Sequence, residues 1–178
     1  IPAGESTVAM TATATDAIGN TSVLTQNVQI DTVVRNFART GGTVNLTGVM
    51  DITGQTLVLD AITGSWVFNG GTLRNGTIGP FIGGAQLTVS TGALDGVVLA
   101  QDLDLPNATS LTSLNGLTLN STLTLTSTGA TTDLFFSGSQ SLLGSGQIVM
   151  GGTSSSSRVF VLSSATLTVG PGITISGR

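Results

Sequence analysis

Residues 94–105 read LDGVVLAQDLDL, and residues 114–125 read LNGLTLNSTLTL. At six positions the second segment carries the same or a similar apolar residue or glycine as the first, always 20 residues further along the chain. The six pairs are Leu94 and Leu114, Gly96 and Gly116, Val97 and Leu117, Leu99 and Leu119, Leu103 and Leu123, and Leu105 and Leu125. Self-similarity at a fixed period of this length is typical of a solenoid, in which each repeat is one supersecondary unit.

Apolar and polar residues alternate within each half of this repeat, as they do in half-buried strands. A strand of three to five residues with one apolar face cannot close a core by itself. Stacking each strand on its counterpart one turn later buries these faces in a continuous column. We therefore expect an all-β protein whose main part is a right-handed parallel β-helix (β-solenoid) with turns of about 20 residues and a rise of ~4.8 Å per turn, which makes roughly seven turns in residues 41–178.

An antiparallel β-sandwich is the competing architecture. Strands spaced by 8–12 residues with turn signals between them are typical of sandwiches and explain the alternation equally well. A sandwich does not explain a 20-residue offset that is kept at six positions. The repeat therefore favours the β-helix.

The first 34 residues have a different pattern, which predicts a β-hairpin. Apolar residues alternate along Thr7–Thr15 and again from Leu24 to Ile30, with turn-forming residues between the two runs. We expect residues 35–40 to link this hairpin to a β-helix at residues 41–178. Asp16, Asn20 and Asp31 are candidate oxygen ligands for calcium, although two carboxylates are few for this ion and the same residues commonly shape turns.

The composition excludes several function classes. The chain has no histidine and no cysteine, so zinc fingers, thiolate sites and histidine general bases are excluded. Its net charge of −4, with only five basic residues, argues against nucleic acid as the main partner. No apolar run approaches the ~20 residues of a membrane span. We expect no cofactor and no bound metal in the β-helix.

Two pairs of residues are candidate contacts for a ligand. Asp102 and Asp104 are the one tight pair of acids, and alternation places both carboxylates on the outer face, ~6–7 Å apart, a spacing that glycosidase carboxylates also have. One turn later they align with Thr122 and Thr124, so the sequence predicts no acidic patch that extends across turns. The favoured interpretation is that Asp102 and Asp104 are solvated surface charges. Trp66 and Phe68 lie two residues apart; such rings can stack on sugars when exposed, but more often they fill the core.

Two further segments give simple structural predictions. Phe135 and Phe136 are consecutive, so one ring faces inward and the other is a candidate surface contact. Residues 151–158 read GGTSSSSR and are expected to form a loop that projects from the solenoid.

Both parts of the chain resemble segments of large bacterial surface proteins. Residues 4–32, GESTVAMTATATDAIGNTSVLTQNVQIDT, resemble the last two strands of a bacterial Ig-like repeat. Residues 138–152, GSQSLLGSGQIVMGG, and 163–177, SSATLTVGPGITISG, together with the 20-residue repeats, resemble the pectin-lyase-like β-helix of filamentous-haemagglutinin-type adhesins and autotransporter passengers.

The resemblance implies a non-enzymatic structural or adhesive segment of a large secreted or cell-surface bacterial protein, of which this chain would be a piece. Its expected location is extracellular or on the cell surface, and its expected partners are surface glycans or another cell-surface protein. A carbohydrate-binding or carbohydrate-active β-helix is the alternative. End-to-end self-association into a filament is a third possibility, because the ends of a solenoid are sheet edges.

Overall fold

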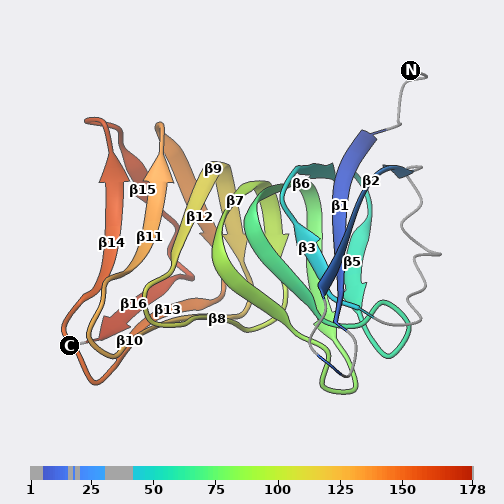
Figure 1. Cartoon of the computed structure of the whole chain (residues 1–178). Coiled ribbons are helices and arrows are strands. Elements are labelled where there is room, and N and C mark those ends of the chain that lie inside the picture. Colours follow the sequence, from blue (N-terminus) through green and yellow to red (C-terminus); the bar gives the residue numbers. More distant parts are fainter. Residues whose placement is uncertain (1–5, 16–17, 19–20, 31–41, 178) are drawn as a thin grey trace.

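The computed structural model describes residues 6–15, 18, 21–30 and 42–177, and every regular element in these ranges is a β-strand (Figure 1). The strands are β1 (Ser6–Thr15), β2 (Thr21–Ile30), β3 (Val44–Leu46), β4 (Val49–Asp51), β5 (Thr56–Leu59), β6 (Trp66–Phe81), β7 (Leu87–Leu99), β8 (Leu103–Leu105), β9 (Ser110–Leu119), β10 (Thr122–Ser127), β11 (Thr132–Ser137), β12 (Gln140–Gly144), β13 (Gln147–Gly152), β14 (Ser157–Leu162), β15 (Leu167–Val169) and β16 (Thr174–Gly177). The described ranges contain no helix that has the length and apolar character needed to cross a membrane.

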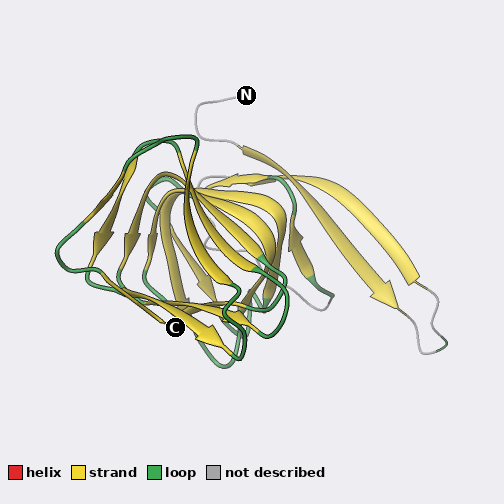
Figure 2. Cartoon of the chain, turned by 90° about the vertical axis from the view of Figure 1, so that its left-hand side faces the viewer, coloured by secondary structure: helices red, strands yellow, loops and turns green. Residues whose placement is uncertain are grey.

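The strands from β3 onward coil into a parallel β-solenoid, as the repeat predicts. In the larger sheet, β3, β6, β7, β9, β11 and β14 follow one another, and each strand pairs in parallel with its counterpart one turn later. A second sheet, in the order β8-β10-β13-β16, forms another face of the coil (Figure 1). Figure 2 shows the stacked turns from the end of the solenoid that carries β14. The six strands stacked in the larger sheet correspond to six turns rather than seven, because the later turns are longer than 20 residues: Gln140 pairs with Leu167.

Four of the six predicted residue pairs are register partners at the predicted offset. They are Val97 with Leu117, Leu99 with Leu119, Leu103 with Leu123, and Leu105 with Leu125. The predicted pair of Leu94 and Leu114 is wrong because β9 carries an extra residue in a bulge: Leu94 pairs with Ser113, and the register shifts before Val97, where Gly96 and Gly116 lie. The bulge contains Asn115 and Gly116, which both have a positive φ. The sequence comparison placed Gly96 opposite Gly116. In the structure, backbone pairing is set separately by the strand residues before and after the bulge.

The core is a single column of side chains from successive turns. The inward-facing residues of all but the last turn are almost fully buried, mostly leucines, and they form one contiguous cluster. Burying each such side chain stabilises the fold by about 1.5–3 kcal/mol. Because neighbouring strands of the solenoid run parallel and share this column, the structure is not a β-sandwich.

The predicted N-terminal hairpin is present and joins the first turn. β1 and β2 pair antiparallel along their whole length, from Ser6 with Ile30 to Thr15 with Thr21. β1 also pairs antiparallel with β3 through Met10 and Thr11, so it covers the edge of the first solenoid strand (Figure 1). A covered edge cannot take up a further strand. The predicted linker at residues 35–40 and the calcium candidates Asp16, Asn20 and Asp31 lie outside the described residues.

The last turn described has a different character from the others. Its strands β14, β15 and β16 each pair only with the preceding turn. As a result, the side chains that continue the inner column are exposed here, namely Val161, Val169 and Ile175, and Phe160 is exposed on the outer face. On the first turn β1 pairs with β3 alone, so β4 and β5, which pair only with β6, also have one edge without a partner among the described strands.

Candidate functional site: a groove beside strand β8

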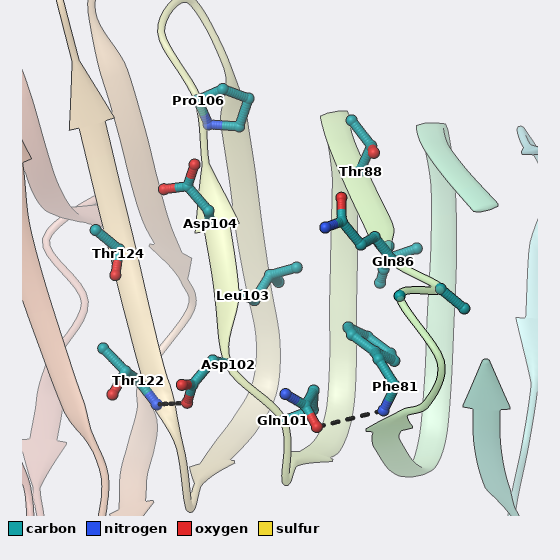
Figure 3. Close-up of a pocket in the computed structure, with 13 residues that line it drawn as sticks. Phe81, Gln86, Thr88, Gln101, Asp102, Leu103, Asp104, Pro106, Thr122 and Thr124 are labelled. Carbon is teal, nitrogen blue, oxygen red and sulfur yellow. Dashed lines mark hydrogen bonds between the residues drawn. The ribbon is translucent and has the colours of Figure 1, made fainter. Parts of the chain in front are cut away.

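A groove of about 560 Å³ lies on the outside of the solenoid, along one side of β8 (Figure 3). Residues from three successive turns line it. Phe81 and the segment from Gly84 to Thr88 form one wall, and the other wall is formed by Gln101 to Asp104 and by two threonines of β10. The groove thus lies where the second sheet begins.

The groove exists because the turn before β8 has no strand on this face. Residues 82–86 cross the face in a tight turn in which the N–H of Ala85 donates to the carbonyl of Ile82 at 3.2 Å. Gly83 and Gly84 have φ values of 65° and 82°, a conformation that glycine adopts at no steric cost. The chain then enters β7 directly, so β8 has no strand beside it on the side of the earlier turn.

The groove has an apolar floor and a polar rim. Ala85, Leu87 and Leu103 are buried at the base. Gln86, Asp102 and Asp104 are exposed along the rim. This division follows from strand alternation, which turns Leu103 inward and its two neighbours outward.

Asp102 and Asp104 lie where the sequence places them, on the outer face and next to β10. The backbone N–H of Thr122 donates to Oδ1 of Asp102 at 2.7 Å (Figure 3). The hydroxyl of Thr126 donates to Oδ1 of Asp104 at 2.6 Å, and Asp104 is the register partner of Thr124. Each carboxylate therefore has one oxygen bonded to the next turn, while its other oxygen has no partner among the described residues.

Gln101 connects the two walls. Its Oε1 accepts a hydrogen bond from the backbone N–H of Phe81 at 3.3 Å, across one turn (Figure 3). The sequence reasoning missed Gln101, Gln86 and Phe81 as groove residues. The glycine pair at residues 83–84 is the signal that points to them, because it marks a tight turn one repeat before Asp102.

The electrostatic character of the groove is negative. Its lining contains two carboxylates and no arginine. The described part of the chain contains no cluster of three acidic, histidine or cysteine residues that would hold a metal ion. The arrangement offers carboxylate and amide oxygens to a hydrogen-bond donor or a cation, and an apolar floor to an uncharged group.

The other predicted contacts lie elsewhere. Trp66 and Phe68 are buried at 2% and 0% exposure, so they belong to the core and no external ligand reaches them. The indole N–H of Trp66 donates to the carbonyl of Thr63 at 3.1 Å, which allows this polar ring to be buried. The prediction that Trp66 and Phe68 contact a ligand is therefore wrong. Both rings pack in the core, which is the alternative that the sequence favoured.

Phe136 faces inward and is fully buried, and Phe135 faces outward, as predicted for consecutive strand residues. The outer ring is not free, because it stacks on Phe160 of the next turn with centroids 5.7 Å apart. The projecting loop predicted at residues 151–158 is wrong. Gly151 and Gly152 belong to β13 and Ser157 to β14, which leaves a turn of only four residues.

The chain matches no protein-family model, no curated protein and no solved structure.

Proposed function

We propose that this chain is a non-enzymatic structural segment of a large secreted or cell-surface bacterial protein, in which the β-solenoid serves as a stiff body that holds attached parts at a distance. The observation that carries the proposal is the continuity of the fold. The parallel ladders of the larger sheet run through all six turns, and one buried column runs through all but the last, so a load on one turn passes directly to the next.

Side chains on the outer surface reinforce the stack between turns. Arg74 on β6 and Asp95 on β7 are register partners, and Nε of the arginine lies 2.9 Å from Oδ2 of the aspartate. The same carboxylate accepts a second hydrogen bond from Nδ2 of Asn115 on the following turn, at 2.7 Å. Three successive turns are thus connected by polar side chains as well as by backbone hydrogen bonds.

Asparagines and threonines form similar connections elsewhere. Oδ1 of Asn107 accepts hydrogen bonds from the backbone N–H groups of Thr128 and Ala130, at 2.8 and 3.0 Å. Oδ1 of Asn120 accepts one from the N–H of Ser145 at 3.3 Å. These side chains satisfy backbone donors at the corners, where the strands end and ladder partners are missing. The abundance of polar uncharged residues on the surface thus has a structural use that requires no ligand.

A mechanical measurement tests this proposal. The protein is held between a surface and a probe at its two ends and pulled at constant velocity. A load-bearing solenoid should unfold at high force in a few steps that each release whole turns of chain. Gradual extension at low force would contradict the proposal.

An activity screen tests the non-enzymatic part independently. Hydrolase and lyase assays on a panel of polysaccharides are run with the wild-type chain and with Asp102→Asn and Asp104→Asn. We expect no turnover. Robust turnover that either substitution abolishes would establish a carbohydrate-active β-helix instead.

A further inference from the structure

One edge of the second sheet is unpaired although it lies in the middle of the solenoid. The register partners of β8 are all on β10: Leu103 with Leu123, Asp104 with Thr124, and Leu105 with Leu125. Among the described strands none pairs with β8 on its other side, where the groove lies. Backbone N–H and C=O groups of an edge strand that face an open space are a template for one more strand.

The lining of the groove suits an added strand. A strand paired with β8 would run about 4.8 Å from it, on the side where the groove separates β8 from the segment from Gly84 to Thr88 (Figure 3). Its inward side chains would rest on the apolar floor beside Leu103 and Leu87. Its outward side chains would lie beside Asp104 on the rim.

The charge pattern of the solenoid itself indicates which side chain belongs beside Asp104. Three other aspartates have an arginine as their register partner on the neighbouring turn: Asp51 and Asp95 both pair with Arg74, and Asp133 pairs with Arg158. Two of these three carboxylates, those of Asp95 and Asp133, form an ion pair with the arginine at 2.7–2.9 Å. The register partner of Asp104 on β10 is a threonine, and no described strand pairs with Asp104 on its free side.

We propose that the free edge of β8 binds an extended peptide of another protein by strand addition. The peptide carries an arginine or lysine beside Asp104, with apolar residues on either side of it that pack beside Leu103 and Leu105. Backbone hydrogen bonds provide affinity, and the alternating side chains provide specificity. The basic residue completes a cross-turn ion pair of the kind that the solenoid already contains twice.

A second copy of this chain is a poor occupant of the same edge. Pairing β8 with β8 would bring the carboxylates of Asp102 and Asp104 of both copies together, and like charges directly opposite each other on paired strands are destabilising. The acidic rim therefore discourages self-pairing through this edge, while it attracts a basic partner.

Binding of a designed peptide tests the proposal. The probe is acetyl-STVRVTS-amide, and amide hydrogen exchange of the full chain is followed by NMR. We expect saturable binding that slows exchange of amides in Leu103–Leu105. The same peptide N-methylated at alternate backbone nitrogens should not bind, because it cannot form the ladder. A peptide with glutamate in place of arginine should bind more weakly.

Protein variants locate the contact. Asp104→Asn keeps an oxygen for the hydroxyl of Thr126 and removes the charge, so binding of the arginine peptide should weaken about two- to five-fold, as for loss of a cross-strand ion pair. Asp51→Asn removes the same charge from β4, outside the groove, and should leave binding unchanged. Asp104→Arg should reverse the preference and favour the glutamate peptide.

Several results would overturn the inference. Equal binding of the N-methylated and unmodified peptides would show attraction by charge without strand addition. Protection of β8 by a neutral glucose oligosaccharide but not by the peptide would make the groove a glycan site. Absence of binding at millimolar peptide, with the chain folded, would also reject the inference. None of these results would affect the proposed structural role, which does not depend on the groove.

Discussion

Arg158 on β14 lies directly beside Asp133 on β11, its register partner one turn earlier, and its guanidinium holds the carboxylate with two hydrogen bonds. Nε donates to Oδ1 at 2.7 Å and Nη2 to Oδ2 at 2.9 Å. The hydrogen bonds to Asp133 raise the pKa of Arg158 above its ordinary value, although burial acts against them. The same guanidinium lies 4.8 Å from the centre of the Phe160 ring. The ion pair with Asp133 thus joins the last two turns, while the contact with the ring of Phe160 holds the guanidinium in place within β14.

Replacing this arginine by lysine should destabilise the last turn more than the same substitution at Arg74. Lysine cannot reproduce the two parallel hydrogen bonds at Asp133, whereas Arg74 uses only Nε toward Asp95. We expect Arg158→Lys to lower the melting temperature measured by circular dichroism more than Arg74→Lys does. A double-mutant cycle with Asp133→Asn should show coupling between the two residues. Additive effects in the cycle would contradict a direct stabilising contact.

A buried polar network inside the core gives a second prediction. Oε1 of Gln140 accepts hydrogen bonds from the Ser113 hydroxyl at 2.8 Å and the Gly116 N–H at 3.1 Å. Its Nε2 donates to the carbonyls of Ser113 and Ser137, at 3.0 and 2.9 Å. The amide thereby binds the Gly116 N–H in the bulge of β9, a carbonyl just before the bulge and the carbonyl at the end of β11.

Gln140→Leu should therefore be costly even though leucine is apolar and similar in size. Each buried backbone group that it leaves unsatisfied costs about 1–3 kcal/mol of the free energy of unfolding. Urea denaturation measures the loss. Gln140→Glu serves as the matched control, since it keeps the shape but replaces the donating amide group by an acceptor, and it should also destabilise the fold. A fully stable Gln140→Leu variant would mean that water replaces the amide.

The sequence predicts the fold well because the repeat and the alternation report the same physical requirement, the burial of one face per strand in a shared column. Leu103, Leu105, Leu123 and Leu125 could be placed in register from their spacing alone. Leu114 could not, because a bulge adds one residue without changing the pattern of residue types. Local pattern identifies strands, whereas register also depends on pairing with the next turn.

The groove was less predictable than the strands. Alternation correctly turns Asp102 and Asp104 outward, but it does not reveal that a space adjoins them. That space depends on the turn at residues 82–86, which lacks a strand on this face and leaves β8 without a neighbour. A space between two turns forms where their backbones follow different courses. The residue pattern of one repeat does not specify the course of the next repeat.

Close stacking of the turns makes some glycines sensitive to any side chain. A Cβ at Gly76 would collide with the backbone carbonyl of Ile52 on the previous turn, and this carbonyl cannot move away without disturbing the hydrogen bond that it accepts from the N–H of Gln55 at 2.8 Å. Gly129 provides the matched control, because its φ is not positive and a Cβ there would meet nothing within 4 Å. We expect Gly76→Ala to lower the free energy of unfolding by about 1–3 kcal/mol, the usual cost of overpacking, and Gly129→Ala to leave it nearly unchanged. Equal effects of the two substitutions would show that the turns are not held at this spacing.

Two aspartates at the first turns should make the stability depend on acid pH. The pKa of Asp60 lies below its ordinary value of 3.8, because its carboxylate accepts hydrogen bonds from the backbone N–H groups of Thr63 and Ile62 and from the Thr63 hydroxyl. For Asp51, burial raises the pKa, but hydrogen bonds from Thr53 and Asn75 and the charge of Arg74 outweigh it, and the net shift is also downward.

A carboxyl group whose pKa is lower in the folded chain than in the unfolded chain binds its proton more weakly when folded. Its contribution to stability is fully present above the unfolded pKa near 3.8 and is lost as the pH falls through the folded value. We therefore expect the urea midpoint to be constant from pH 7 to about pH 5 and to fall below about pH 4. Asp60→Asn should be less stable than the wild type at pH 7 and should lose less on acidification, since it has no charge to neutralise. A variant whose urea midpoint falls as far as that of the wild type between pH 5 and pH 2.5 would show that this carboxylate does not contribute to the acid sensitivity.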